Sequence, residues 1–229
     1  TGISPFRRVM AAFMAVVLAM GLTPTGAWAA TGGDAALAAG TLSSGMQTLD
    51  EAGDSADALV IATADELAAF RDTVNDGDTF AGRTVLLNAD IDLSEVSWKP
   101  IGPMGKAKVR FAGTFDGQGH TVTLGSIDDS GTTATGAGLF GVLGGDAVIK
   151  NVTVAGKVES KANSVGGVAA TSYGASFFNV CNLADVKSNS TSGSSIAVGG
   201  VVATAAAGNS GDPTVLENCA NKGTVDAGA

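Results

Sequence analysis

The chain has 229 residues, of which 33 are glycine, and it carries 22 acidic against 13 basic residues for a formal net charge of −9. Glycine is about twice as frequent as its usual share of roughly 7 %, whereas aromatic residues make up only 5 %. An acidic chain without a Lys/Arg cluster argues against nucleic acid or anionic lipid as a partner, and many small side chains favour thin stacked strands over a bulky core.

Residues 1–29 have the three parts of a secretory signal peptide. Arg7 and Arg8 precede an uncharged stretch over residues 9–22, and Ala27-Trp28-Ala29 is a small-x-small cleavage site. About 14 apolar residues are fewer than the ~20 needed to span a bilayer. We therefore expect export with cleavage before Ala30 and no membrane span in the mature chain, whose net charge would be −11 because only two basic residues leave.

Residues 30–58 are mostly Ala, Gly and Ser, with five acidic residues and no basic one. Such a segment cannot bury enough apolar surface to offset the entropy lost on ordering. We expect a flexible linker here and the folded domain over 59–229.

A short amphipathic helix follows Leu59-Val60-Ile61. Thr63 and Glu66 form a capping-box pattern, apolar residues recur at helical spacing at Leu67, Phe70 and Val74, and Asn75-Asp76-Gly77-Asp78 ends the helix. We expect this helix, over 64–75, to cover the open N-terminal end of a stack of strands.

From residue 84 onward the apolar period is two. Short strands are predicted at 84–87, from Ile91 through Trp98, and at 120–124, with turns at 100–103 and 116–119. Strands every 8 to 12 residues fit a sandwich, a barrel or a parallel β-helix.

An internal repeat decides between these folds. Three segments, about 136–158, 164–186 and 197–225, each begin with a Gly-containing strand, reach an Asn and then run seven residues on to a Val. The third copy has a six-residue insertion near residues 209–213. A short period of this kind is typical of a solenoid, and it predicts an all-β, right-handed parallel β-helix. The equivalent residues are Gly138, Gly166, Gly199; Asn151, Asn179, Asn218; and Val158, Val186, Val225.

The string "LLNADIDLSEVSWKPIG…FAGTFDGQGHTV", followed by "GLFG" and by units of the type "VGGV…NCANKGTV", resembles bacterial surface proteins built on the GLUG repeat. The resemblance covers about residues 60–229. It implies coils of a right-handed, pectate-lyase-like parallel β-helix, in adhesins or in the non-catalytic regions of IgA1-specific metallopeptidases.

Stacked coils place equivalent residues in columns about 4.8 Å apart. We therefore expect the Asn151, Asn179 and Asn218 side chains to form an amide ladder at a corner, although an amide-lined sugar groove is an alternative. Val152, Val154, Gly156 and Val158 should share the inward face. Cys219 falls on the Val152 column and Cys181 one position further, so the two thiols should point opposite ways and stay unpaired.

Candidate chemistry is sparse. His120 would need a positioned partner to act as a general base. Asp90 and Asp92, with Glu95 nearby, could hold calcium through oxygen ligands, but a solvated strand face is the commoner explanation. Asp128-Asp129 and Asp76/Asp78 have the pattern of turn residues. The outward positions of the repeats are Thr, Ala, Lys and Ser, and they lack the converging carboxylates that a polysaccharide lyase on this fold requires.

The sequence therefore predicts a secreted or cell-surface bacterial adhesion or scaffold module that is not an enzyme, with no catalytic residues, no cofactor and no metal. The alternatives are the N-terminal part of a longer secreted protease of the IgA1-specific metallopeptidase type, and a polysaccharide lyase or glycosidase on the same fold. We expect an extracellular glycan or protein surface as ligand. We also expect self-association through an uncapped C-terminal coil, since the chain shows no capping element after Val225 and further coils would follow it in a longer protein.

Overall fold

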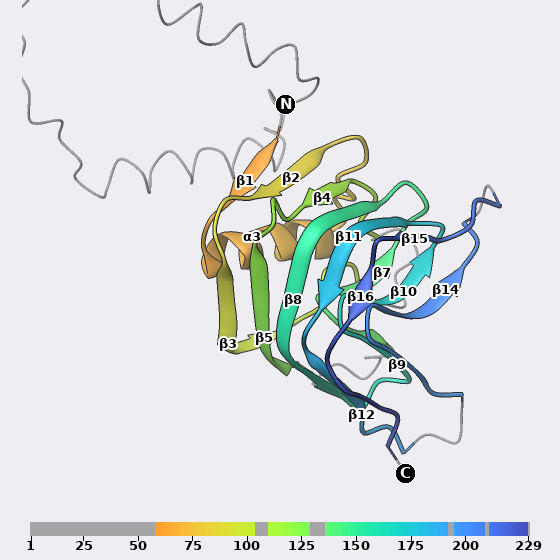
Figure 1. The fold of residues 1–229 in the computed structure, drawn as a ribbon. Coiled ribbons are helices and arrows are strands. Elements are labelled where there is room, and N and C mark those ends of the chain that lie inside the picture. The colour runs from red at the N-terminus through yellow and green to blue at the C-terminus, as the bar shows by residue number, and fades with distance from the viewer. Residues whose placement is uncertain (1–57, 104–109, 129–135, 192–194, 209–210, 229) are drawn as a thin grey trace, which may run out of the picture. The chain divides into compact units, whose positions relative to one another are not determined.

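The computed structural model describes residues 58–103, 110–128, 136–191, 195–208 and 211–228. These residues form a parallel β-solenoid with one short helix (Figure 1). The predicted signal peptide over 1–29 and the linker, except for its last residue, lie outside the described residues.

The strands of the described chain form three sheets in which every pair is parallel. The largest sheet bends through two corners, and its first stretch stacks one strand from each successive coil. That stretch consists of β1 (Leu59–Ile61), β2 (Thr84–Leu87), β4 (Thr114–Asp116), the start of β8 (Val148–Ser160), the start of β11 (Ser176–Asn182) and β15 (Val215–Glu217).

The same sheet continues around the coil beside β8 and β11. The further strands are β3 (Ile91–Trp98), β5 (Thr121–Ile127), β12 (Asp185–Ser188), β16 (Ala220–Asn221) and β17 (Val225–Asp226). Two smaller sheets close the coils. They contain β7 (Phe140–Leu143), β10 (Ala169–Tyr173) and β14 (Val202–Ala206), and β6 (Gly136–Ala137), β9 (Ser164–Gly166) and β13 (Ala197–Gly199).

Columns of apolar side chains fill the interior between these sheets. One column runs in register from Val85 through Phe115, Ile149 and Phe177 to Leu216. Its first four members are fully buried, and each burial of this kind contributes about 1.5–3 kcal/mol. The alternation of period two predicted this inward face.

The predicted helix is α3 (Ala64–Asn75), and its capping box is formed as expected. The Glu66 amide donates to Thr63 Oγ1 over 3.3 Å, and the Thr63 amide donates to Glu66 Oε2 over 3.1 Å. Leu67, Phe70 and Val74 are buried. The Phe70 ring makes edge-to-face contacts with Phe80 and with Phe111, with ring centroids 4.9 and 5.7 Å apart.

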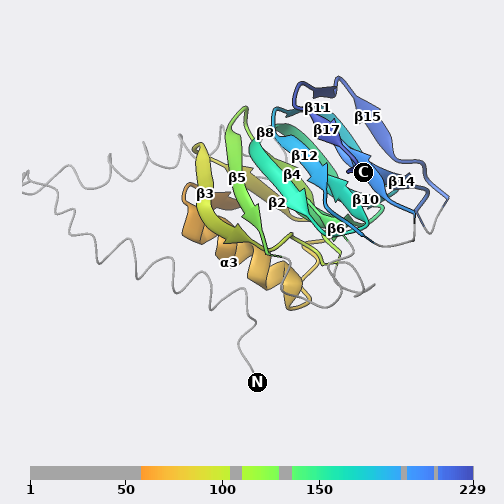
Figure 2. The ribbon, with the colours of Figure 1, turned by 90° about the horizontal axis from the view of Figure 1, so that it is seen from below.

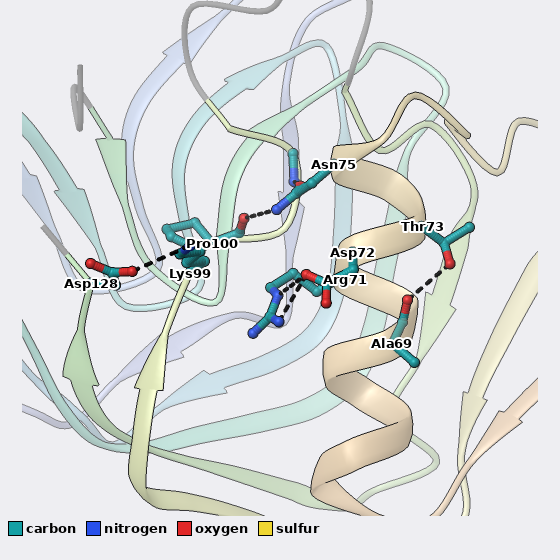
Figure 3. A network of polar contacts seen from close by, with 9 residues as sticks. Ala69, Arg71, Asp72, Thr73, Asn75, Lys99, Pro100 and Asp128 are labelled. Carbon is teal, nitrogen blue, oxygen red and sulfur yellow. Dashed lines mark hydrogen bonds and ion pairs between the residues drawn. The ribbon is translucent and has the colours of Figure 1, made fainter. Parts of the chain in front are cut away.

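The C-terminal end of α3 is fixed to the turn after β3. The Asn75 Nδ2 donates to the Pro100 carbonyl over 3.1 Å, and its Oδ1 accepts from the Gly102 amide over 2.8 Å (Figure 3). Figures 1 and 2 both place α3 near β3 and away from β15. The helix therefore covers the N-terminal end of the solenoid, as predicted.

The three predicted repeats are three successive coils. Gly199 pairs with Gly166, and Val225, Val186 and Val158 lie in register. Residues 207–214 join β14 to β15, whereas only residues 174–175 join β10 to β11, which is the predicted insertion.

Gly166 and Gly199 lie in the short strands β9 and β13 with which their copies begin, and they form the corner to the next strand. One detail of the predicted repeat is wrong. Gly156 is exposed and not on the inward face. Its φ of +88° turns β8 through a corner, so that Gly156 and Lys157 both face outward before Val158 points inward again.

Candidate functional site

A ladder of amides runs across the coils at the corner within β8 and β11. The Asn179 Nδ2 donates to Asn151 Oδ1 over 3.0 Å, and the Asn218 Nδ2 donates to Asn179 Oδ1 over 2.6 Å. All three residues have a left-handed backbone, with φ between +52° and +55°, a conformation that Asn tolerates better than most residues. The predicted ladder is confirmed, and its amides bond to one another.

Asp116 ends this ladder on the N-terminal side, and the sequence did not predict its role. Its Oδ1 accepts from Asn151 Nδ2 at 3.0 Å and from the Gln118 amide at 2.9 Å, and Lys150 Nζ lies 3.3 Å from its Oδ2. Burial pushes the pKa of Asp116 upward. The hydrogen bonds from Gln118, Asn151 and Lys150 outweigh it, so the pKa of the carboxyl is lowered.

A second amide pair joins the buried Asn182 to Asn221, which is exposed in the last described coil. Asn182, fully buried, donates through Nδ2 to Asn221 Oδ1 over 2.7 Å and to the Ala184 carbonyl over 2.8 Å. Glycines across the interior make room for both amides, because a Cβ at Gly167 would lie 2.2 Å from Asn182 Oδ1 and one at Gly200 would lie 2.1 Å from Asn221 Cγ. Asn182 and Asn221 are the repeat equivalents of Val154, which was expected on the inward face, but the alignment did not reveal these partners.

A shallow groove of about 200 Å³ crosses the outer face of β8, β12 and β17, smaller than the ~300 Å³ at which small-molecule pockets begin. Asp185 accepts from the amide and the hydroxyl of Thr224 over 3.0 and 2.7 Å, and Lys187 Nζ lies 3.4 Å from Asp226 Oδ2. The lining residues are Lys157, Glu159, Asp185, Val186, Lys187, Thr224 and Asp226.

The two aspartates of this groove are held ionised. The hydroxyl and amide of Thr224 lower the pKa of Asp185, and the Gly228 amide and then Lys187 lower that of Asp226. The sequence did not reveal this cluster. The repeat alternation places Asp185 and Asp226 outward in their own copies, but only Thr, Ala, Lys and Ser were named from the outward positions.

His120 has a partner, which the sequence did not identify. Its Nδ1 lies 3.2 Å from Asp90 Oδ1, and the same oxygen accepts from the Thr121 amide over 2.8 Å. These hydrogen bonds, the Thr121 bond first, lower the pKa of Asp90. Because Asp90 precedes β3 and His120 precedes β5, the pair joins two adjacent coils.

The structure does not bring Asp90 and Asp92 together as ligands. Asp92 Oδ1 instead accepts from the Ser94 amide over 2.8 Å, and this bond lowers its pKa. Within the described ranges, no three His, Cys, Asp or Glu side chains gather as a metal site would require. No helix in this part of the chain is long and apolar enough to cross a membrane.

Both cysteines are free thiols, as predicted. Cys219 packs against the core, with its Sγ 3.5 Å from the Phe177 carbonyl oxygen. Cys181 lies in register with Thr153 and Ala220, one position from the column of Cys219. The strand register from which unpaired thiols were predicted is therefore confirmed.

The chain is similar to parts of known proteins. No protein-family model matches it, so the GLUG resemblance is carried only by the residues quoted above. The chain is 36 % identical to halomucin from Haloquadratum walsbyi over 140 residues. These residues make up 57 % of this chain and 1 % of that protein. The chain thus spans a very small part of that relative. Among solved structures it is similar to a proposed immunoglobulin A1 protease from Bacteroides ovatus, with a TM-score of 0.48 and 19 % identity over 72 % of this chain and 57 % of the other.

Proposed function

We propose that the chain is a non-catalytic module of a secreted or cell-surface protein, and that it contacts extended glycans through the groove on β8, β12 and β17. The observation that carries this proposal is that the outer polar side chains form hydrogen bonds from one coil to the next. Asn151, Asn179 and Asn218 bond to one another from coil to coil, and Asp116 and Asp185 accept hydrogen bonds from neighbouring coils.

The state of the carboxyl groups supports a binding role over a catalytic one. A general acid in a glycosidase needs a raised pKa. Hydrogen bonds lower the pKa of Asp90, Asp92, Asp116, Asp185 and Asp226, which makes each of them a poor proton donor near neutral pH.

The groove has the chemistry to contact a hydroxyl-rich chain. The carboxylates of Asp185 and Asp226 can accept hydrogen bonds from sugar hydroxyls, and the ammonium groups of Lys157 and Lys187 can donate hydrogen bonds to sugar oxygens. The similarity to a stretch of a far longer protein supports the idea of one module among many. One solenoid module among many in a long protein extends the molecule and presents a binding surface.

A binding experiment with matched variants tests this proposal. The chain purified from an exporting host is applied to an array of immobilised polysaccharides, beside the variant Lys157→Ala/Lys187→Ala and the control Lys99→Ala, whose exposed ammonium pairs with Asp128. We expect retention of the chain and the control on at least one polysaccharide. The double variant should bind about tenfold more weakly, which corresponds to a loss of about 1.4 kcal/mol.

The same arrays report catalysis. Release of sugar fragments that stops on Asp116→Asn or Asp90→Asn substitution would show an enzyme and overturn the proposal. Equal binding by the double variant and the control would show that the groove is not the contact surface.

A further inference from the structure

The charged side chains of the groove on β8, β12 and β17 alternate in sign. Strand register places Lys157 beside Asp185, and it places Lys187 between Glu159 on β8 and Asp226 on β17. Adjacent parallel strands lie about 4.8 Å apart, and residues two positions apart along one strand are about 6.6 Å apart. The nearest charges around each of these side chains in the groove are therefore of opposite sign, both across the strands and along them.

Contacts within the groove show that both ammonium groups lie beside carboxylates. Lys187 Nζ is 3.4 Å from Asp226 Oδ2. The pKa of Asp185 is lowered first by Thr224 and also by the charge of Lys157. The groove has two lysines against three carboxylates, so its net charge is −1 on a chain whose net charge is −9.

An anionic glycan gains little from such a surface. A sulfate or carboxylate group that approaches either lysine also approaches side-chain carboxylates only about 4.8 to 6.6 Å further on, and charges of like sign repel at that distance. The negative net charge of the chain adds a repulsion of longer range. A hydroxyl group can both accept from an ammonium group and donate to a carboxylate, so an uncharged glycan can use both kinds of side chain.

We propose that the groove selects uncharged, hydroxyl-rich glycans and rejects glycans that carry sulfate or carboxylate groups. This inference rests on the proposed function, because it names the class of glycan that the same groove contacts. The carboxylates on either side of Lys187 are the source of the rejection. Their removal should open the groove to a sulfated chain.

Binding to immobilised dextran sulfate tests the source of this rejection with two matched variants. Glu159→Gln/Asp226→Asn removes the carboxylates on either side of Lys187 and changes the net charge of the groove from −1 to +1. The control Asp92→Asn/Glu95→Gln makes the same change in the net charge of the chain on the exposed face of β3, outside the groove. At low salt we expect the groove variant to bind dextran sulfate at least about tenfold more tightly than the control, and added salt should remove the difference.

The parent chain gives a second reading that needs no variant. It is applied to pairs of polysaccharides with a common backbone, hydroxyethyl cellulose beside carboxymethyl cellulose and dextran beside dextran sulfate, and to the full array. We expect every polysaccharide that retains the chain to be uncharged.

Two results would overturn the selection by charge and leave a glycan-binding module in place. One is retention of the parent chain on a charged polysaccharide at least as strong as on its uncharged counterpart. The other is equal binding of dextran sulfate by the groove variant and the control. Absence of binding to every polysaccharide of the array would overturn the proposed function, and this inference with it.

Discussion

At the scale of single residues, the outer amide ladder joins two requirements at one position. Asn179 holds a left-handed backbone with φ of +55° and exchanges hydrogen bonds with Asn151 and Asn218. Asn meets both requirements, because it tolerates this backbone region and has both a donor and an acceptor in its side chain.

Substitutions at Asn179 separate these two contributions. Asn179→Gly keeps the left-handed backbone and removes two amide bonds, so we expect a loss of about 1–3 kcal/mol in the free energy of unfolding. Asn179→Ala also places a Cβ in the left-handed region and should cost up to about 1 kcal/mol more. Denaturant unfolding measures both values. A Gly variant as stable as the parent would show that the ladder bonds contribute nothing, and an Ala variant no worse than Gly would remove the backbone argument.

The sequence predicted the ladder because the Asn residues recur at the same place in the repeat. It did not predict the contacts of Asn182 with Gly167, or of Asn221 with Gly200, because these partners lie on opposite walls of a coil. Periodicity shows which residues share a column, but it does not show which columns face each other.

At the scale of elements, α3 is a cap whose stability comes from both its end and its apolar face. The capping box at Thr63 is worth about 0.5–2 kcal/mol. The buried Phe70 ring, which contacts Phe80 at 4.9 Å, fills space in the first coil. Both features could be predicted from the sequence, because capping patterns and helical spacing depend on residues that are close together in the chain.

We expect Phe70→Ala to lower the free energy of unfolding by about 3–5 kcal/mol, and Thr63→Ala by about 1 kcal/mol. The control is Thr73→Ala in the same helix, whose hydroxyl donates to the Ala69 carbonyl over 2.9 Å (Figure 3). It should change stability by less than about 0.5 kcal/mol. Thermal unfolding followed by circular dichroism compares the three, and a Phe70→Ala value close to that of Thr73→Ala would contradict the role of α3 as a packed cap.

The corner at Gly156 shows where element-level prediction failed. Gly156, at φ of +88°, faces outward at a corner of β8, whereas the outward positions of Asp185 and Asp226 in β12 and β17 agree with the alternation. A strict two-residue alternation predicts Gly156 on the inward face and therefore misses this corner. That Gly156 and Lys157 both face outward at this corner is known only once the chain is folded.

At the scale of the whole molecule, hydrogen bonds lower the pKa of five aspartates in the described part of the chain below the ordinary value of 3.8: Asp90, Asp92, Asp116, Asp185 and Asp226. A carboxyl whose pKa is lower in the folded than in the unfolded chain adds stability above its unfolded pKa. This stability is lost as the pH falls through the folded value. The solenoid should therefore be acid-sensitive.

We expect the melting temperature to change little between about pH 7 and 5 and to fall steeply below about pH 4. Asp116→Asn should lower the melting temperature at neutral pH and reduce its fall in acid, since the protonated parent and the amide are both uncharged. Scanning calorimetry over this range measures both effects. A parent melting temperature that stayed constant below pH 4, or an unchanged acid dependence in Asp116→Asn, would contradict the assignment.

The central claim is that this solenoid is an extracellular module. Its most direct test is to label intact source cells with an amine-reactive reagent that cannot cross membranes, because Lys99 and Lys187 have exposed side chains, 63 % and 41 %. The account predicts that the chain is labelled on intact cells or found in the medium, and that its N-terminus is Ala30. A chain that is labelled only after lysis and still carries residues 1–29 would contradict it.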